Sequence, residues 1–318
     1  MDISVCIVSW NTRELLCNCI DSILKMTSGV SYEVIVVDNN SSDGSAEMVK
    51  QQFPQCKLIE SKNNNGFAKG NNLGLRVATG KYILYLNPDT VLITNALYGM
   101  FHFMEANTNI GAVGCKLLNQ DGSIQFTCAR TFPTLFNQFC YFMMLNRLFP
   151  KSCSTIEMSY WDHRDSREID CLSGACILAR KDIINKLQGF DEKFFMYAED
   201  VELCYRIKRE GWKLYYLASE EIYHLEGASS KKQSQKYFSA IAMRESNFQF
   251  FVKHYGKVSA QVYKLIIFIG SVFRLLVILL SSLNLIRRTN KPHREVVINK
   301  YMNLALWSLG RKKNKRFF

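Results

Sequence analysis

The first two thirds of the chain alternate short apolar runs with segments of helical periodicity. Buried strands are predicted at residues 3–8, 33–37, 57–59 and 82–86, where apolar side chains predominate. Helix-like segments lie between them at residues 13–25, 46–52 and 68–78. Further strands are predicted at residues 112–116, 171–179 and 213–217, and further helices at 181–186 and 201–210. Because strands and helices alternate, the pattern predicts βαβ units, a mostly parallel sheet and an α/β fold.

Two stretches depart from this pattern. Residues 132–167 are rich in Phe, Tyr and Met and then turn polar. This composition predicts either an insertion that contacts a substrate or a membrane, or an irregular packed connection. From residue 231 onward the chain is predicted to be mainly helical. Within it, residues 265–286 form an apolar stretch long enough to span a membrane, although Arg274 lies in its middle.

Polar side chains of this tail helix share one side. Lys264, Ser271, Arg274, Ser281 and Ser282 fall within one sector of a helical wheel. Lysines and arginines flank the stretch at both ends, whereas a spanning helix normally shows a bias toward one side. The pattern therefore favours a helix that lies in or dips into the membrane interface, over a spanning helix and over the core helix of a helical appendage.

Composition and charge narrow the choice of partners. Lysine and arginine exceed aspartate and glutamate by 40 to 28, which gives a net charge of +12 and fits nucleic acid, anionic membrane or phosphorylated substrates. Much of the excess lies beside the apolar tail helix, including the cluster at 311–316, so anionic lipid is favoured over nucleic acid. Eleven scattered cysteines without a CxxC pair indicate a reducing cytosol. The N-terminus enters a strand at once, so no secretory signal peptide is expected.

The turn that follows the second predicted strand contains the first candidate ligand-binding residue. In VVDNNSSDGS, Asp38 ends an apolar strand, where the carboxyl ends of parallel strands face a ligand crevice. Its carboxylate can accept a hydrogen bond from a nucleobase N–H or from ribose. Asp43 can act in the same way or can cap the following helix.

Glycines recur every fourth residue in NNNGFAKGNNLG, the segment from Asn63 to Gly74. This spacing differs from the G-x-G-x-x-G loop of dinucleotide-binding domains. It puts small residues on one helix face, which allows close packing or close approach of a ligand. The asparagines offer amide contacts to a polar ligand.

A candidate cation site follows the strand predicted at 82–86. Asn87 and Asp89 are two residues apart, so in extended backbone they point to the same side. Hard oxygen ligands of this kind suit Mg²⁺ or Mn²⁺. An ordinary Asn-Pro-Asp turn explains the same residues without a metal.

Two later segments carry candidate catalytic groups. Glu199 and Asp200 begin a predicted helix directly after an aromatic run, where apolar surroundings raise a carboxylate pKa and make it a useful general base. Stabilisation of a helix N-terminus is the alternative explanation for both acids. His224 follows a predicted strand, and its loop can approach the same crevice.

Together these motifs resemble a family 2 glycosyltransferase of the rhamnosyltransferase type. The resemblance covers about residues 3–230 and includes, in the family's order, VSWN, VDNNSSDGS, NNGFAKGNNLG, LNPD, SGACILARKD, GFDEKFFMYAEDVELCYR and HLEGAS. It implies a GT-A-like nucleotide-sugar-binding domain at 1–230, with a helical, basic, membrane-associating tail at 231–318.

The resemblance also implies roles for individual residues. It makes Asp38 a nucleobase contact, and it places Asn72 and Gly74 near the donor. Asn87 and Asp89 occupy the DxD positions, with Asp89 the firmer metal ligand because Asn87 departs from the acidic pattern. Asp200 matches the catalytic base, with Glu199 beside it. His224 matches a histidine that completes metal coordination in some relatives.

The function implied is inverting transfer of a sugar from a nucleoside diphosphate to an acceptor hydroxyl. Rhamnose from dTDP-rhamnose is the first candidate donor, and a lipid-linked saccharide precursor of a surface polysaccharide is the candidate acceptor. The enzyme is expected at the cytoplasmic side of the cell membrane, as a peripheral or monotopic protein without nucleic acid as a partner. A catalytically inactive relative and a nucleotide-dependent oxidoreductase are the alternatives. The chain lacks the glycine fingerprint of a nucleotide-dependent oxidoreductase, and such an enzyme would have no function for Asp89.

Overall fold

A computed structural model of the chain describes residues 1–153, 156–158, 160–194, 197–225, 233–283 and 291–311. Contacts within the chain divide it into two compact units. The first consists of Met1–Phe132 and Trp161–Ser229, and the second of Pro133–Tyr160 and Ser230–Phe318. The aromatic segment that follows Phe132 therefore belongs with the C-terminal helices, whereas the sequence had assigned it to the first domain.

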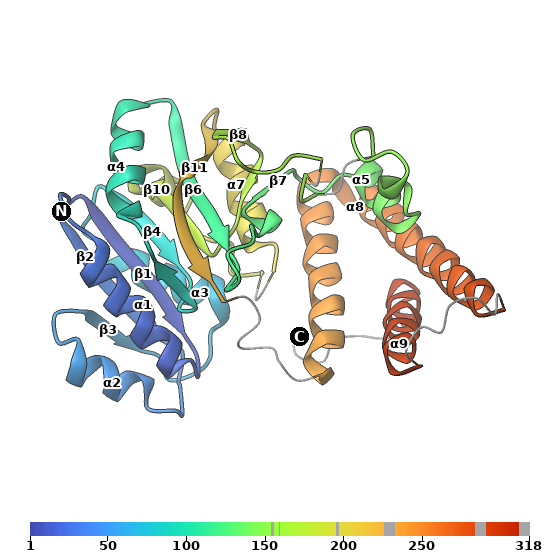
Figure 1. The fold of residues 1–318 in the computed structure, drawn as a ribbon, viewed down its shortest axis with the longest axis horizontal. Helices are drawn as coiled ribbons and strands as arrows, with labels where there is room; N and C mark the ends of the chain where they lie inside the picture. The colour runs from blue at the N-terminus through green and yellow to red at the C-terminus, as the bar shows by residue number, and fades with distance from the viewer. Residues whose placement is uncertain (154–155, 159, 195–196, 226–232, 284–290, 312–318) are drawn as a thin grey trace. The chain divides into compact units, whose positions relative to one another are not determined.

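The first unit is built on a nine-stranded mixed sheet (Figure 1). Its strands are β1 (Ile3–Ser9), β2 (Tyr32–Asp38), β3 (Lys57–Glu60), β4 (Tyr82–Leu86), β5 (Thr90–Leu92), β6 (Ile110–Leu118), β8 (Arg167–Ile169), β10 (Cys176–Arg180) and β11 (Lys213–His224). The strand order is β3-β2-β1-β4-β10-β6-β11-β5, and β8 pairs with β11. Strands β3, β2, β1, β4, β6 and β11 point the same way, while β10, β5 and β8 run against them. The mostly parallel α/β sheet predicted from the sequence is confirmed.

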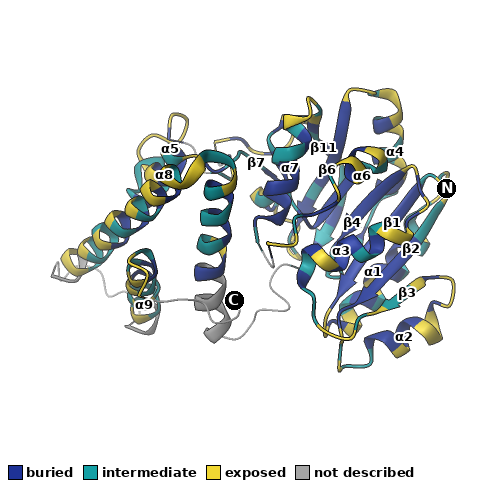
Figure 2. Ribbon diagram, turned by 180° about the vertical axis from the view of Figure 1, so that it is seen from behind, coloured by how far each residue is buried: buried dark blue, intermediate teal, exposed yellow. Residues whose placement is uncertain are grey.

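Helices cover both faces of this sheet. They are α1 (Arg13–Met26), α2 (Ser45–Gln52), α3 (Gly66–Val77), α4 (Ala96–Ala106), α6 (Lys181–Lys186) and α7 (Glu199–Arg209). The opposite views in Figures 1 and 2 show α1 and α4 over one face and α3 and α6 over the other. The central strands β1, β2, β4, β6 and β10 are buried over most of their length, as the dark blue ribbon of Figure 2 shows. This double coverage explains why the strands read as continuous apolar runs.

One predicted strand is interrupted, and the interruption matters for the site. Residues 171–179 form two separate strands, β9 (Cys171–Leu172) and β10, with a turn at 173–175 between them. Strand β9 leaves the main sheet and pairs antiparallel with β7 (Ala129–Arg130), directly after the 3-10 helix η1 (Phe126–Cys128). The turn therefore lies between a two-stranded ribbon and the edge of the main sheet.

The second unit is helical. It contains α5 (Leu135–Phe142), the 3-10 helix η2 (Leu145–Arg147), α8 (Gln233–Leu283) and α9 (Lys291–Ser308). Gly256 has φ 85° and ψ 165°, so α8 consists of two helices joined at this residue. A positive φ of this size favours glycine. The buried core of the second unit includes Phe251, Tyr263, Ile267 and Trp307.

The second half of α8 turns its polar side chains inward and its apolar side chains outward. Ser271 is fully buried. Arg274 donates hydrogen bonds to the carbonyl oxygens of Tyr141 and Phe142 at the end of α5 and to the Tyr301 hydroxyl. A cation satisfies the free carbonyls of a helix C-terminus well, so protein groups at the end of α5 account for Arg274 in this apolar stretch. Ser281 and Ser282, which belong to the same predicted sector, lie outside the side chains that the structure describes.

The outward side of this helix is apolar without interruption. Between residues 262 and 280 every exposed side chain is aliphatic, namely those of Val262, Leu265, Ile269, Val272, Leu276, Leu279 and Leu280. Figure 2 shows exposed positions along α8. Within the described residues, one helical stretch, Ile241–Leu280, is long and apolar enough to cross a membrane. Its most apolar window has a mean hydropathy of 2.2 and is 22% buried. The low burial distinguishes it from the core helix of a soluble domain.

Candidate active site

Most of the predicted site residues come from segments that meet at one edge of the main sheet. Strands β1, β2 and β4 are parallel neighbours, with Ser9 opposite Asp38 and Ile7 opposite Leu86, so they end at the same edge. Strand β10 is antiparallel to β4 and begins there. The carboxyl edge of a parallel sheet is where ligands of open α/β folds bind.

Asp38, at the end of β2, has one oxygen that is not used by the protein. Its side chain is 4% exposed. Oδ2 accepts a hydrogen bond from the Ser41 amide at 3.0 Å, whereas Oδ1 is buried and has no hydrogen-bond partner among the described residues. A buried carboxylate oxygen of this kind normally has a partner, so a ligand N–H or O–H is a fitting one. Asp43 is different, because its carboxylate accepts hydrogen bonds from the Arg13 amide and from Ser45. These are the first residues of α1 and α2, so Asp43 links the starts of the two helices.

Asn72 and Gly74 of α3 contact protein. The Asn72 amide accepts a hydrogen bond from the Phe190 amide at 2.8 Å and donates to the Phe190 carbonyl at 2.9 Å and to Glu192 at 3.1 Å. A Cβ atom on Gly74 would lie 2.2 Å from Cys6 Sγ. Gly74 therefore lets α3 pack closely against β1. Asn72 thus holds the backbone at Phe190, and Gly74 lets α3 sit close to Cys6.

Asn87, Asp89 and His224 converge from two separate strands. His224 Nε2 lies 3.4 Å from Asp89 Oδ1 and 3.4 Å from Asn87 Nδ2. The Leu225 amide donates to the Asp89 carbonyl at 2.8 Å, which ties the end of β11 to the loop after β4. The Asn87 amide donates to the Ala175 carbonyl at 3.0 Å, so the same loop is tied to the turn before β10. Residues 135 positions apart in the sequence are thus held as one cluster.

Gln125 orients His224, and sequence reasoning missed it. Gln125 Nε2 donates to the His224 carbonyl at 2.7 Å and to Asn119 Oδ1 at 2.8 Å. These two acceptors assign the amide nitrogen, so Gln125 Oε1 is the atom that lies 2.8 Å from His224 Nδ1. Nδ1 of the neutral ring then carries the proton, and the Nε2 lone pair points toward Asp89. Ligating histidines are commonly oriented in this way by their other ring nitrogen.

This corner suits a divalent cation. A histidine lone pair and a carboxylate oxygen face each other at 3.4 Å, and the tautomer that Gln125 selects puts no imidazole proton between them. A half-turn of the Asn87 amide would present its oxygen to the same place. In the described part of the chain no group of three or more His, Cys, Asp or Glu side chains is arranged to hold a metal. A cation bound here would therefore need further oxygen ligands from a ligand or from water.

Glu199 and Asp200 start helix α7 and have opposite surroundings. Asp200 Oδ2 accepts hydrogen bonds from Arg130 Nη2 at 2.5 Å and from the Gly174 amide at 2.9 Å, and Oδ1 accepts from the Val201 amide at 2.7 Å. Glu199 Oε2 is buried without a hydrogen-bond partner among the described residues. Burial, and next the charge of Asp200, raise the pKa of Glu199 to about 8. At neutral pH Glu199 is therefore protonated, whereas both oxygens of the Asp200 carboxylate accept hydrogen bonds. Of the aromatic run before them, Phe195 and Met196 lie outside the described residues.

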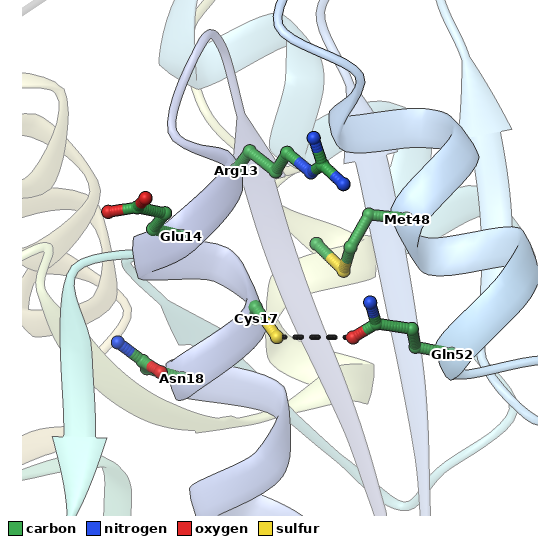
Figure 3. A pocket seen from close by; sticks show the side chains of 6 residues that line it. All are labelled: Arg13, Glu14, Cys17, Asn18, Met48 and Gln52. Atoms are coloured by element: carbon green, nitrogen blue, oxygen red, sulfur yellow. Dashed lines mark hydrogen bonds between the residues drawn. The ribbon is translucent and has the colours of Figure 1, made fainter.

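A surface pocket of about 400 Å³ lies away from these residues (Figure 3). It is lined by side chains of α1 and α2, namely Arg13, Glu14, Cys17, Asn18, Met48 and Gln52. The Cys17 thiol donates a hydrogen bond to Gln52 Oε1 at 3.4 Å. None of the predicted site residues lines it, and we assign it no part in the chemistry.

The fold and the cluster at the sheet edge define a nucleotide-sugar transferase of the GT-A type. The model of glycosyl transferase family 2 matches residues 4–187, and the chain belongs to this family. It is a glycosyltransferase. N-acetylglucosaminyl-diphospho-decaprenol L-rhamnosyltransferase of Mycobacterium tuberculosis is 27% identical over 231 residues, which cover 68% of this chain and 74% of that protein. Rhamnosyltransferase WbbL of Escherichia coli is 28% identical over 202 residues, covering 61% and 72%. The resemblance to rhamnosyltransferase-type members is confirmed.

Solved structures confirm the fold. Mannosyltransferase PcManGT from Pyrobaculum calidifontis, in complex with GDP-Man and Mn²⁺, matches with a TM-score of 0.59 at 15% identity, over 98% of this chain and 88% of that one. GalNAc-T7 with UDP, GalNAc and Mn²⁺ matches with a TM-score of 0.53 at 14% identity, over 80% and 51%. At identities this low, the two matches show only that the fold is GT-A-like.

Proposed function

We propose that this glycosyltransferase moves a sugar, rhamnose from dTDP-rhamnose in the first instance, from a nucleoside diphosphate to a hydroxyl of a lipid-linked saccharide, with inversion. The observation that carries the proposal is the cluster of Asn87, Asp89 and His224 at the sheet edge. The names of the Mycobacterium tuberculosis and Escherichia coli relatives support rhamnose, and the former also supports a polyprenyl diphosphate acceptor.

On the donor side, Asp38 is the nucleobase contact and the cluster receives the diphosphate. The unused Oδ1 of Asp38 supports the first role. Asp89 and His224, with Asn87 beside them, would hold Mg²⁺ or Mn²⁺, which neutralises charge on the departing diphosphate. Asn72 and Gly74 contribute through the backbone that they position.

On the acceptor side, Asp200 takes the proton of the attacking hydroxyl. The acceptor oxygen forms its bond to the anomeric carbon as the bond to the diphosphate oxygen breaks, and that electron pair leaves with the nucleoside diphosphate. A single displacement inverts the anomeric centre and needs no covalent enzyme intermediate. Glu199 stays protonated at neutral pH and tunes its neighbour. Three hydrogen bonds to the Asp200 carboxylate support its ionised state.

The proposal includes a location at the cytoplasmic side of the cell membrane, with the second unit as the part that binds the membrane. Its support is the aliphatic outward side of α8 together with lysine and arginine on both flanks. Apolar area binds the bilayer, and basic residues bind anionic headgroups. Most of the basic cluster at 311–316 lies outside the described residues. An inactive sugar-binding relative would not require Asp89, His224 and Asp200 together, and family membership does not support an oxidoreductase.

Paired assays of donor binding and sugar transfer test the assignment. Asp200→Asn should reduce transfer by about 100-fold or more while donor binding measured by calorimetry stays near wild type. Glu199→Gln should have a milder effect. Asp89→Ala should weaken donor binding in the presence of Mn²⁺, and EDTA should reproduce this in wild type. Normal transfer by Asp200→Asn would refute the base, and full activity in EDTA would refute the metal.

A further inference from the structure

Arg130 is a partly buried arginine beside the two acids of α7, and none of the roles above uses it. It lies in β7, whose Ala129 and Arg130 pair with Leu172 and Cys171 of β9. Its side chain is 18% exposed. Nη2 donates to Asp200 Oδ2 at 2.5 Å and to the Leu172 carbonyl at 3.0 Å. The contact therefore joins a short ribbon outside the main sheet to the first turn of α7.

The segment that carries Arg130 is held from several sides. The Gln125 amide donates to the Leu117 carbonyl at 2.8 Å, which anchors the start of the segment to β6. The buried His163 ring lies 3.3 Å, through Nε2, from the Ala129 carbonyl. With the β7–β9 pairing, these contacts leave the Arg130 backbone little freedom. A guanidinium fixed in this way can hold a carboxylate in one orientation.

Around the start of α7, one cationic side chain faces two carboxyl groups. Arg130 is the cation that the structure places in contact with Asp200, and Glu199 and Asp200 are the two neighbouring acids. The other titratable groups that face this cluster are the Cys171 and Cys204 thiols, of β9 and α7. One cation balances one carboxylate, so the second acid is stable in a buried site when it carries a proton. Asp200 has the guanidinium and two backbone amides, whereas Glu199 Oε2 has no partner among the described residues.

We propose that Arg130 is a positioning residue for sugar transfer, which holds Asp200 ionised and in place so that Asp200, and not Glu199, accepts the acceptor proton. The inference rests on the proposed function, because it presumes that Asp200 is the base. Arg130 acts through Asp200 and needs no contact with either substrate. Without the guanidinium, the two acids would share one proton, and Asp200 would ionise only at higher pH.

The test is the pH dependence of transfer in Arg130→Met and Arg130→Lys. We expect Arg130→Met to lower transfer at pH 7 by about 100-fold and to move the acid limb of the pH profile upward, with calorimetric donor binding unchanged. Arg130→Lys keeps the charge but loses the planar fork, so it should keep the acid limb near wild type with a smaller loss of rate. A wild-type acid limb in Arg130→Met, or a shift of equal size in both variants, would overturn the proposal.

A second measurement separates an effect of Arg130 through Asp200 from an effect elsewhere in the protein. In an Asp200→Asn background no carboxylate remains for Arg130 to orient, so adding Arg130→Met should change the residual transfer less than twofold. A further large loss in the double variant would show that Arg130 acts elsewhere. If Asp200→Asn alone transfers normally, the base assignment fails instead, and the two failures are thereby distinguished.

The matched control is the other buried ion pair of α7. Arg206 Nε bonds both oxygens of Glu202, at 2.9 and 2.8 Å, and Glu202 is fully buried. Arg206 also donates to the Leu187 and Gly189 carbonyls, so its role is structural. Arg206→Met should lower the melting temperature and leave the pH profile of transfer unchanged. A shifted profile in this control would attribute the Arg130 effect to general loosening of α7 and overturn the proposal.

Discussion

At the scale of single residues, the site depends on side chains that select one state of their neighbours. Gln125 selects a tautomer of His224, and Arg130 selects an orientation of Asp200. The sequence indicated Asp89 and His224 because each follows a predicted strand, and Asp200 because it begins a predicted helix after an aromatic run. It gave no sign of Gln125 or Arg130, because their partners are 99 and 70 residues away. Contacts across that distance follow from the packing of β6, β7, β9 and β11, which no local pattern encodes.

Replacement of Gln125 tests the tautomer. Gln125→Met keeps the side-chain length but removes the acceptor for Nδ1 and both amide donations, so the His224 ring would no longer be fixed. We expect Mn²⁺ affinity, measured by electron paramagnetic resonance in the absence of donor, to fall by about 10- to 100-fold. Asn119→Ala, which removes only a contact to Gln125 and one to Ser123, should cost much less. Equal Mn²⁺ affinity in wild type and Gln125→Met would contradict the role given to Gln125.

Burial of Glu199 makes stability depend on pH. Its pKa is about 8 in the folded protein, above the ordinary value of 4.5. Between these two pH values the unfolded chain ionises Glu199 while the folded protein keeps it protonated. The free energy of unfolding therefore falls as pH rises through this window, by about 1.4 kcal/mol per pH unit for this group at most. Glu199→Gln should melt at a higher temperature than wild type at pH 8.5 and at a similar temperature at pH 4.5. A gain of the same size at both pH values would speak against a raised pKa.

At the scale of elements, most strands and helices of the sheet domain could be predicted from the sequence, but not all of them and not all of their bounds. Strand β4 has the predicted bounds, β1 is one residue longer at its end, and β2 is one residue longer at each end. Both faces of these strands are covered, so their apolar runs are unambiguous. The predicted strand at 171–179 was wrong in its middle, because the turn at 173–175 brings the Gly174 amide to Asp200. Helix α4 and strand β5 were missed altogether.

For helix α8, the helical wheel predicted a polar side but not the direction in which that side faces. The wheel gathered Ser271 and Arg274 on one side but could not say which way that side faces. The partners of Arg274 are the last carbonyls of α5 and the Tyr301 hydroxyl, so the polar side faces the unit's own core. Gly270 shows the same close approach, because a Cβ there would lie 2.4 Å from Phe142 Cβ. The aliphatic side is left facing outward.

Polar substitutions on that outward side test membrane binding. Leu265 and Leu276 are 55% and 52% exposed, so Leu265→Gln with Leu276→Gln should change folding stability by less than about 1 kcal/mol. Binding to vesicles that contain phosphatidylglycerol, measured by flotation, should weaken at least about tenfold, because apolar contact with the bilayer is lost. Val77→Gln with Tyr98→Gln is the matched control, since these residues of the first unit are 40% and 42% exposed. Equal flotation of the two double variants would remove α8 as the anchor.

At the scale of the whole molecule, the proposed roles divide between the two units. Every residue given a part in donor binding, metal binding or proton transfer belongs to Met1–Phe132 or Trp161–Ser229. The second unit is formed by two separate segments of the sequence, Pro133–Tyr160 and Ser230–Phe318. A boundary near residue 230 was visible in the composition. The composition did not indicate that the segment after Phe132 packs with the C-terminal helices, because its partners on α8 lie about 130 residues later.

This division predicts that membrane binding and chemistry can be separated. Truncation is a poor tool, because removing α8 would expose the apolar side of Phe142 and its neighbours, which pack against Phe251, Tyr263 and Ile267. The Leu265→Gln, Leu276→Gln variant keeps that core. We expect it to bind donor and to transfer sugar to a short-chain, water-soluble diphosphate-linked acceptor within about twofold of wild type. Transfer to a long-chain polyprenyl-linked acceptor in vesicles should fall at least about tenfold, because the enzyme must share the surface of its substrate.

Two comparisons decide between the alternatives for this variant. Loss of transfer to both acceptors would mean that the substitutions disturb the catalytic unit, which the melting temperature would reveal. Undiminished transfer to the vesicle-bound acceptor would mean that the second unit is not needed at the membrane. The control Val77→Gln, Tyr98→Gln should match wild type with both acceptors. The expected pattern, loss confined to the acceptor in the bilayer, arises only if the apolar side of α8 brings the site of the first unit to a substrate that cannot leave the membrane.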